Sequence, residues 1–239
     1  MNNIYISIII PCFNEKKTII KVINKIKKIK KLKKQIILID DGSNDGTREL
    51  IKKKLYKKID KIIFHKNNKG KGAAIISSMR YIKGNLIIIQ DADLEYDPKD
   101  YYKLIKPFSK RDVLAVYGSR VLGRKKKINL VKINDFSKNF RVFGNYVLTK
   151  ISNFLNNQSL TDVHTCYKIL RKDVFLKLNL KETGFSFCPE VTTKLAKFSY
   201  KIVEVPINYN GREVKDGKKI RFKDAISALI TILKYKFFY

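Results

Sequence analysis

The chain has 239 residues, which is enough for one large domain with a sizeable buried core. It holds 52 lysines and arginines against 21 aspartates and glutamates, and this balance indicates anionic partners: phosphorylated substrates, acidic membrane surfaces or nucleic acid. Its three cysteines lack CxxC spacing, which argues against a disulfide framework or a structural zinc site. A composition rich in Ile, Lys, Asn, Tyr and Phe is also typical of AT-rich genomes, so mutational bias accounts for part of the lysine excess.

The first half of the chain alternates short apolar runs with helical patterns. The runs are rich in β-branched residues and lack strict alternation, as expected of parallel strands covered on both faces. They lie at 5–10, 35–40, 61–65, 85–90 and 113–118. Apolar stripes at helical spacing lie between them, at 19–29, 50–55 and 73–79. This order predicts an α/β fold with an open, mostly parallel, Rossmann-like sheet and helices on both faces.

After residue 121 the regular alternation stops. A basic stretch at 122–128 precedes an amphipathic segment at 136–155, whose apolar stripe we expect to pack mainly in the core. The pattern then predicts helices at 172–178 and 189–198 and a strand at 201–209. Residues 222–239 combine an apolar face with basic ends, which is typical of helices that lie in a membrane interface. No apolar run reaches the roughly 18 residues of a membrane span, and the polar residues that follow the first apolar run argue against a signal peptide.

Polar loops follow three of the predicted strands. They begin at Pro11, Asp40 and Asp91, after the first, second and fourth strands. Open α/β sheets bind ligands outside the carboxyl ends of their strands. We therefore expect these loops to meet at one edge of the sheet.

The loop after the fourth strand has the chemistry of a metal site. Asp91 and Asp93 are separated by one residue, so on extended backbone their side chains point the same way. Two close carboxylates repel each other, and a bound divalent cation reverses the sign of that interaction. We predict that Asp91 and Asp93 bind a metal ion. Glu95 is open to metal, substrate or water, whereas Asp97 before Pro98 is expected to cap a helix.

The loop after the second strand, DDGSNDGT at 40–47, has the chemistry of a nucleotide site. A carboxylate at the position of Asp40 can accept hydrogen bonds from a base N–H or a ribose hydroxyl. A plain turn rich in Asp and Gly would explain Asp45 and Gly46, but not Asp40 and Asp41 at the end of an apolar strand.

Four stretches resemble, in order and spacing, the family 2 glycosyltransferases with the GT-A fold: IIIPCFNE (8–15), IDDGSNDGT (39–47), NKGKGAA (68–74) and QDADLEYDP (90–98). Later stretches look like the polyprenyl-phosphate (dolichyl-phosphate) hexosyltransferase branch: YGSR (117–120), RVFGNYVLTKISNFL (141–155), LTDVHTCYKILRKDV (160–174), GFSFCPEVTTKL (184–195) and VPINYNGREVKDGKKIRFKD (205–224). The resemblance implies one GT-A domain over 1–239. Within it, 1–120 would bind the nucleotide sugar, 121–221 would bind the acceptor, and 222–239 would form an amphipathic helix without a transmembrane span.

The resemblance also implies a reaction and the residues that serve it. It implies an inverting, Mg²⁺- or Mn²⁺-dependent transfer of one hexose from UDP-glucose or GDP-mannose to a polyprenyl phosphate. The residues that match donor-binding positions are Pro11, Phe13, Glu15, Asp40, Asp41, Lys71, Asp91 and Ala92, with Asp91 and Asp93 as the metal ligands. The positions implied in catalysis are Asp93, Arg120, Asp162 and Arg212, the last with Lys218 nearby in a late basic loop. The roles of Asp162 and Glu190 are open, as is that of His164, which stands where many relatives carry a carboxylate.

Two kinds of acceptor are compatible with these residues. A phosphate monoester is already largely dianionic at neutral pH, so it needs positive charge rather than a base. A cytosolic transferase acting on a glycan or protein hydroxyl would instead need a carboxylate base. We favour the lipid phosphate, with peripheral contact to the cytoplasmic face of a membrane. A nucleic-acid partner is disfavoured because it gives no reason for the acidic loops.

Overall fold

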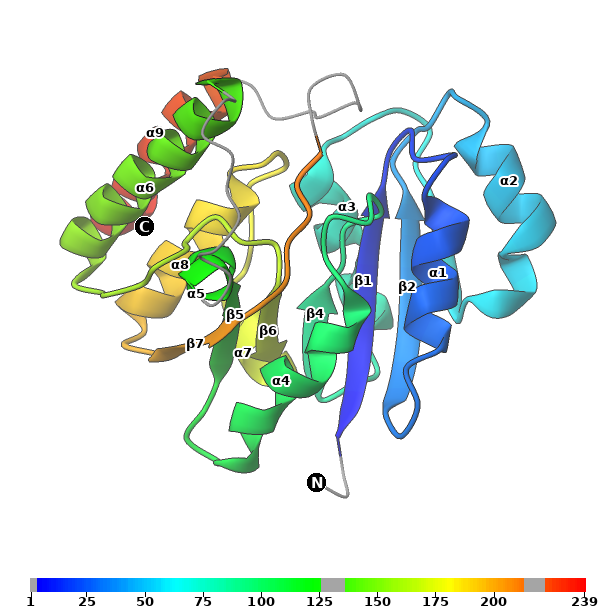
Figure 1. The fold of residues 1–239 in the computed structure, drawn as a ribbon, viewed down its shortest axis with the longest axis horizontal. Helices are drawn as coiled ribbons and strands as arrows, with labels where there is room; N and C mark the ends of the chain where they lie inside the picture. The colour runs from blue at the N-terminus through cyan, green and yellow to red at the C-terminus, as the bar shows by residue number, and fades with distance from the viewer. Residues whose placement is uncertain (1–3, 126–135, 213–221) are drawn as a thin grey trace.

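The computed structural model describes residues 4–125, 136–212 and 222–239 (Figure 1). Within these ranges seven strands form one sheet in the order β3-β2-β1-β4-β6-β5-β7. The strands are β1 (Tyr5–Cys12), β2 (Lys33–Asp40), β3 (Lys61–Phe64), β4 (Leu86–Ile89), β5 (Ala115–Ser119), β6 (Lys168–Arg171) and β7 (Ile202–Pro206). The α-helices are α1 (Ile19–Lys27), α2 (Thr47–Lys54), α3 (Lys71–Ser78), α4 (Tyr101–Ile105), α5 (Arg120–Lys125), α6 (Phe136–Asn156), α7 (Lys172–Lys177), α8 (Phe187–Lys197) and α9 (Phe222–Phe237). Short 3₁₀ helices are η1 (Tyr56–Lys58), η2 (Met79–Tyr81), η3 (Pro98–Asp100) and η4 (Lys106–Ser109).

The sheet is mostly parallel, as predicted. β1 pairs in parallel with β2 and β4, β2 with β3, and β5 with β7, whereas β6 runs antiparallel to both of its neighbours. The strand β6 is absent from the sequence-based prediction. It has four residues and passes directly into α7, so its short apolar pattern merges with the helical pattern that follows.

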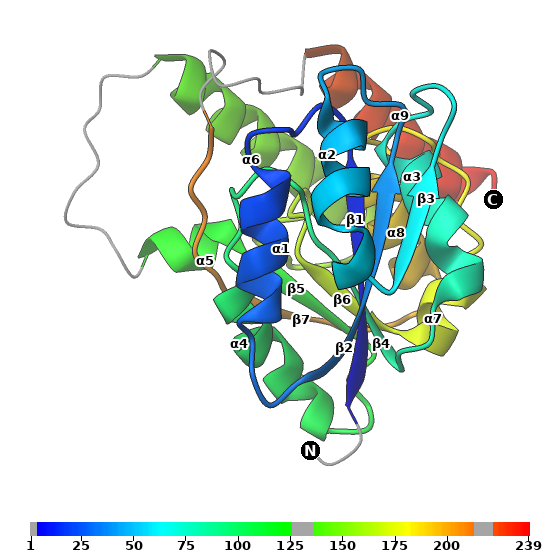
Figure 2. The same cartoon turned by 90° about the vertical axis from the view of Figure 1, so that its right-hand side faces the viewer.

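Helices cover both faces of the sheet, which explains the unbroken apolar runs. Figure 2 shows α1 and α4 on one side and α3, α7 and α8 on the other. In β1, neighbouring residues that point to opposite faces are both fully buried, such as Ile8 and Ile9. A strand buried on both faces has no polar face to display, so strict alternation is lost.

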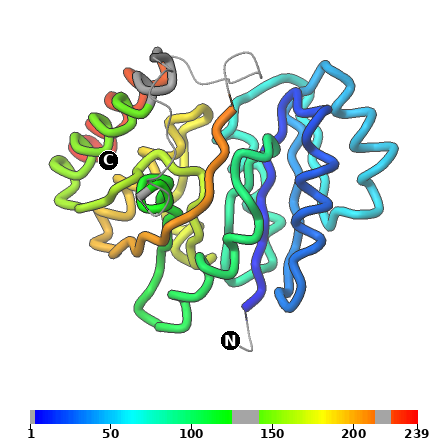
Figure 3. The backbone as a smooth tube through the Cα atoms, in the orientation of Figure 1, coloured from blue at the N-terminus to red at the C-terminus, as the bar shows by residue number. Residues whose placement is uncertain are grey.

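Helices α6 and α9 lie side by side at one end of the molecule, and both contact α8 (Figure 3). The expectation that the apolar stripe of α6 packs mainly in the core is wrong for Phe143, which is 63% exposed, and for Phe154, which is 88% exposed. Leu148, Ile151 and Leu155 of the same stripe are half-buried. The buried face of α6 instead carries Ser152 and Asn156, whose short side chains permit close packing. Asn156 donates hydrogen bonds to Ser152 and to Thr193 of α8, both at 3.3 Å.

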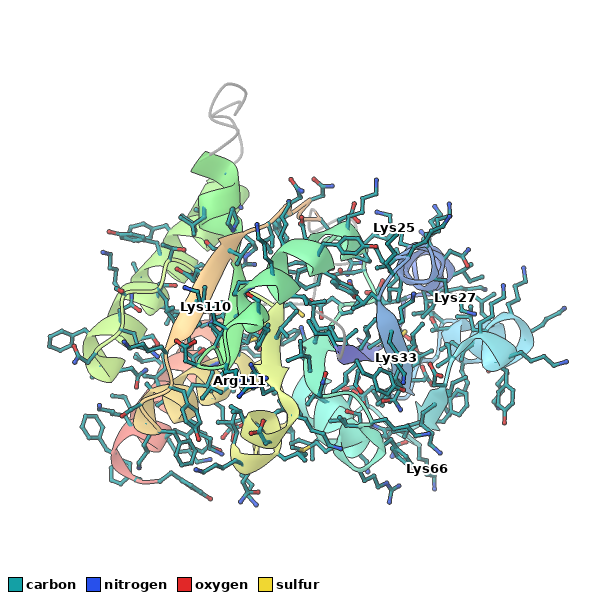
Figure 4. All side chains as sticks on the ribbon, turned by 90° about the horizontal axis from the view of Figure 1, so that it is seen from below. Lys25, Lys27, Lys33, Lys66, Lys110 and Arg111 are labelled. Atoms are coloured by element: carbon teal, nitrogen blue, oxygen red, sulfur yellow. The ribbon has the colours of Figure 1, made fainter. Side chains whose placement is uncertain are left out.

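The basic side chains are spread over separate elements. Figure 4 labels six of them, from α1, β2, the loop after β3 and the segment after η4, and all six are exposed: Lys25, Lys27, Lys33, Lys66, Lys110 and Arg111. The positive charge is therefore not confined to one edge of the sheet. Within the described ranges, no helix has the combination of length and apolar character needed to cross a bilayer.

Candidate active site

The three polar loops meet at the carboxyl edge of the sheet, as expected. Cys12 lies opposite Asp40 in the parallel register of β1 and β2, and the Asp41 amide donates to the Cys12 carbonyl at 2.8 Å. On the other side of β1, the amide of Gln90 donates to the carbonyl of Ile9 at 2.9 Å. The ends of β1, β2 and β4 are therefore neighbours.

Asp91 is paired with Lys71, the first residue of α3. Lys71 Nζ lies 2.6 Å from Asp91 Oδ1 and also donates to Cys166 Sγ at 3.3 Å. Burial alone would lower the pKa of Lys71, but the charge and hydrogen bond of Asp91, together with Cys166 and Cys188, hold this pKa well above its ordinary value. The same pairing overcomes the burial of Asp91 and lowers the pKa of its carboxyl group.

Arg212 joins three carboxylates from two of the loops. Its guanidinium contacts Glu15 through two hydrogen bonds of 2.9 and 3.1 Å and Asp93 through one of 3.2 Å, while Nε lies 3.9 Å from Glu95. Despite this cation, burial and then the charges of Asp91 and Glu95 raise the pKa of Asp93 to about 7. Negative charge is therefore crowded at Asp93.

Tyr209 connects this cluster to a second one. Its hydroxyl donates to Glu95 at 2.6 Å, and its ring lies 5.1 Å from the guanidinium of Arg120. Arg120 holds Asp162 in a two-point ion pair with both hydrogen bonds at 2.7 Å. Burial would raise the pKa of Asp162, but Arg120 lowers it. No pattern in the single sequence points to Tyr209, because a tyrosine near a late strand end has no distinctive spacing.

Only one of the two carboxylate oxygens of Asp40 accepts a hydrogen bond within the described part of the chain. Its side chain is fully buried, and Oδ2 accepts a 2.6 Å hydrogen bond from Arg48. Oδ1 is also buried but has no hydrogen-bond partner in the described part of the chain. Because a buried acceptor without a donor costs free energy, this oxygen suits the N–H or O–H of a ligand.

Other predicted donor-site residues lie near the same edge of the sheet. Pro11 and Phe13 are half-buried at and just after the end of β1, and Ala92 is buried between Asp91 and Asp93. Asp41 instead uses both carboxylate oxygens within the chain, where they accept from the loop before α3 and from His65. The Asp41 carboxylate thus holds the backbone that borders the site.

The remaining acidic and basic candidates have internal partners or are not described. Glu190 is buried and accepts hydrogen bonds from the amides of Lys181 and Glu182 and from Lys194 Nζ, at 2.6 to 2.8 Å. Asp97 caps η3, as predicted: its carboxylate accepts from the amide of Lys99, and Pro98 is the first residue of the turn. Lys218 lies outside the described residues.

The carboxylates of Asp91 and Asp93 suit a divalent cation by chemistry. No group of three His, Cys, Asp or Glu residues in the described ranges forms a ready metal site. The two aspartates nonetheless offer hard oxygen ligands, and the crowded charge at Asp93 is what a cation would relieve. Magnesium is often held by one or two carboxylates while substrate phosphates and water supply its other ligands.

Comparison with known proteins agrees with this geometry. The model of the family described as glycosyl transferase family 2 matches residues 7–178. The chain belongs to this family. This family 2 glycosyltransferase is 28% identical over 214 residues to a dolichol-phosphate mannosyltransferase of Pyrococcus furiosus. The aligned region covers 89% of this chain and 58% of the relative. The chain is 26% identical to a dolichyl-phosphate beta-glucosyltransferase of Dictyostelium discoideum, over 100% of the chain and 76% of the relative.

Solved structures identify the fold. Glucosyl-3-phosphoglycerate synthase of Mycobacterium tuberculosis has a TM-score of 0.73 and 15% identity, with 98% of this chain and 81% of that one covered. Its complex with Mn²⁺, UDP and glucosyl-3-phosphoglycerate has a TM-score of 0.71, with 98% and 80% covered. This family 2 glycosyltransferase therefore has the expected GT-A fold. The chain spans little more than half of the archaeal mannosyltransferase that it matches.

Proposed function

We propose that this glycosyltransferase moves one hexose from UDP-glucose or GDP-mannose to a polyprenyl phosphate with inversion, supported by Mg²⁺ or Mn²⁺. The observation that carries the proposal is that Asp162 and Glu190, the two carboxylates with unassigned roles, are both held by internal partners. Asp162 is locked by Arg120 and Glu190 by Lys194 and two amides, so neither is presented as a free base. A hydroxyl acceptor needs a base, whereas a phosphate acceptor does not.

Donor binding is assigned to the carboxyl edge of the sheet. The unpartnered Oδ1 of Asp40 would accept from the base or ribose, beside Pro11 and Phe13. Glu15 and Lys71 would border the nucleotide and its phosphates. A diphosphate could compete with Asp93 and Glu15 for Arg212, since guanidinium binds phosphate and carboxylate with similar geometry.

Asp91 and Asp93 would hold the metal ion, with Ala92 between them. When bound, the ion would offset the negative charge that develops on the leaving nucleoside diphosphate. Arg120, next to Tyr209, would face the donor diphosphate or the acceptor phosphate. Its Nη1 takes no part in the two hydrogen bonds to Asp162, so the guanidinium has donors left to offer.

Access to a lipid acceptor would come through α6 and α9. Their outer faces carry large exposed apolar side chains: Val142, Phe143, Tyr146, Val147 and Phe154 on α6, and Ile226, Ile230, Leu233 and Phe237 on α9, followed by Phe238 and Tyr239. Helices that combine an apolar face with lysines bind the surface of anionic bilayers. We propose that this surface seats the protein peripherally on the cytoplasmic face of a membrane.

The deciding experiment supplies both donors and a lipid acceptor. The protein is incubated with Mg²⁺ or Mn²⁺, vesicles containing polyprenyl phosphate, and labelled UDP-glucose or GDP-mannose in parallel. We expect label in the organic phase from one donor, and none from vesicles that lack the polyprenyl phosphate. Nucleotide binding without a lipid product from either donor would overturn the proposal. A labelled water-soluble glycoside would point to a hydroxyl acceptor instead.

A further inference from the structure

His65 contacts two side chains that are far apart in the sequence, those of Asp41 and Ser77. It follows β3 directly and is 7% exposed. Its Nδ1 lies 2.7 Å from Asp41 Oδ1, and its Nε2 lies 2.9 Å from Ser77 Oγ in α3. A carboxylate only accepts hydrogen bonds, so Nδ1 carries a proton and donates a hydrogen bond to Asp41.

The order serine, histidine, aspartate is also that of hydrolytic triads, but the surroundings give these residues a different task. Ser77 lies inside a helix, where its one hydroxyl proton has two acceptors within reach, the carbonyl of Ala73 at 2.9 Å and Nε2 of His65. Asp41 does more than face the histidine. Its carboxylate accepts from the backbone amides of Lys69 at 3.0 Å and Gly70 at 2.8 Å.

Those two amides immediately precede Lys71, whose ammonium group lies 2.6 Å from Asp91. The backbone of this loop is also packed closely against the carbonyl of Thr183. Gly70 has a φ of +97°, and a Cβ there would come within 2.5 Å of the carbonyl oxygen of Thr183. The Ala73 amide donates to the same carbonyl at 3.0 Å. The loop is thus held between Thr183 and the Asp41 carboxylate, and His65 holds that carboxylate.

We propose that His65 is a positioning residue for the transfer reaction. By anchoring Asp41 between the end of β3 and α3, it fixes the amides of Lys69 and Gly70 and thereby sets Lys71 against Asp91. This inference rests on the proposed role of Lys71 at the donor phosphates. Without His65, the Asp41 carboxylate loses its side-chain donor and is free to rotate or to take up water, and the loop before Lys71 loosens.

The test combines amide exchange with donor kinetics in four variants. His65→Ala removes both contacts, and His65→Asn keeps an N–H donor on the Asp41 side. Ser77→Ala removes the contact to Nε2 together with the bond to the Ala73 carbonyl, and it keeps the contact between His65 and Asp41. Ser78→Ala is the matched control, because the hydroxyl of Ser78 bonds to the carbonyl of Ile75 within its own helix, at 2.6 Å. Exchange is measured at the amides of Lys69 and Gly70, and the donor KM and kcat are measured separately.

We expect His65→Ala to speed exchange at Lys69 and Gly70 by about tenfold or more and to raise the donor KM by a similar factor. His65→Asn should recover much of both losses, Ser77→Ala should lie between His65→Ala and the wild type, and Ser78→Ala should match the wild type. Unchanged exchange at these two amides in His65→Ala, or faster exchange spread evenly over the whole chain, would overturn the inference. If the wild type transfers neither donor, the proposed function fails, and the exchange rates still decide the role of His65.

Discussion

Arg120 and Asp162 form a two-point ion pair that joins the start of α5 to the loop before β6. The Nε–Oδ2 and Nη2–Oδ1 distances are both 2.7 Å, and the Arg120 amide donates to the same carboxylate at 3.0 Å. Removing one member of a buried pair leaves the other charge without compensation. The pair therefore ties the integrity of the second half of the chain to a residue whose catalytic role is open.

Asp162→Asn should lower the free energy of unfolding by roughly 2 to 4 kcal/mol, since it strips Arg120 of its counter-charge while keeping the shape of the side chain. Urea denaturation measures the loss. The exposed Asp173 of α7 supplies the control, and Asp173→Asn should cost less than about 0.5 kcal/mol. Full stability of Asp162→Asn with complete loss of transfer would instead assign Asp162 to the chemistry.

Asp93→Ala should abolish the metal-dependent part of donor binding while leaving the fold intact. The side chain lies in crowded negative charge, with its pKa raised to about 7, so its removal relieves repulsion as it removes an oxygen ligand that we propose for the metal ion. Calorimetry with UDP or GDP, with and without Mn²⁺, measures the effect. Asp97→Ala removes the cap of η3 and a 3.8 Å ion pair with Lys25, and it should cost about 1 kcal/mol of stability and keep donor binding. Equal Mn²⁺-dependent affinity in Asp93→Ala and the wild type would refute the assignment.

His164 should make the protein sensitive to acid. Burial, followed by the charge of Lys168, lowers the pKa of His164 from 6.5 to about 4, so folding favours the neutral ring. The stability that this contributes is fully present above pH 6.5 and is lost as the pH falls toward 4. Between neutral pH and pH 4 the wild type should lose about 1 to 3 kcal/mol more than His164→Gln. Parallel stability curves for the two proteins would contradict this prediction.

The apolar surface of α6 and α9 should bind anionic vesicles. Phe154, Ile230 and Phe237 are 88, 59 and 61% exposed, and changing all three to Ser should weaken vesicle binding at least about tenfold in a flotation assay. Tyr56→Ser tests the specificity, because Tyr56 is 67% exposed but lies in η1. If Tyr56→Ser loses as much vesicle binding as the triple variant, nonspecific hydrophobic adsorption, and not this surface, drives association.

Local patterns predicted much of the fold. The apolar runs of β1 to β4 and the helices between them follow from periodicity, and the cap at Asp97 follows from the Asp-Pro pair. The prediction of which face of α6 is buried failed, because that depends on where the neighbouring helix lies. The stripe of α6 has the spacing of a core helix, but α8 packs on its polar side, so Phe143 and Phe154 face outward. Periodicity identifies two faces of a helix without saying which one meets a neighbour.

The sequence by itself determined the fold class, the family resemblance and the edge of the sheet where the polar loops gather, because strand order and motifs at strand ends are local properties. Only the tertiary structure decided which side chains share a partner. Arg212 meets Glu15 across 197 residues, Tyr209 joins Arg120 to Glu95, and His65 is set between Asp41 and Ser77. These contacts depend on how separate elements pack to within hydrogen-bond distance, and no spacing along the chain encodes that.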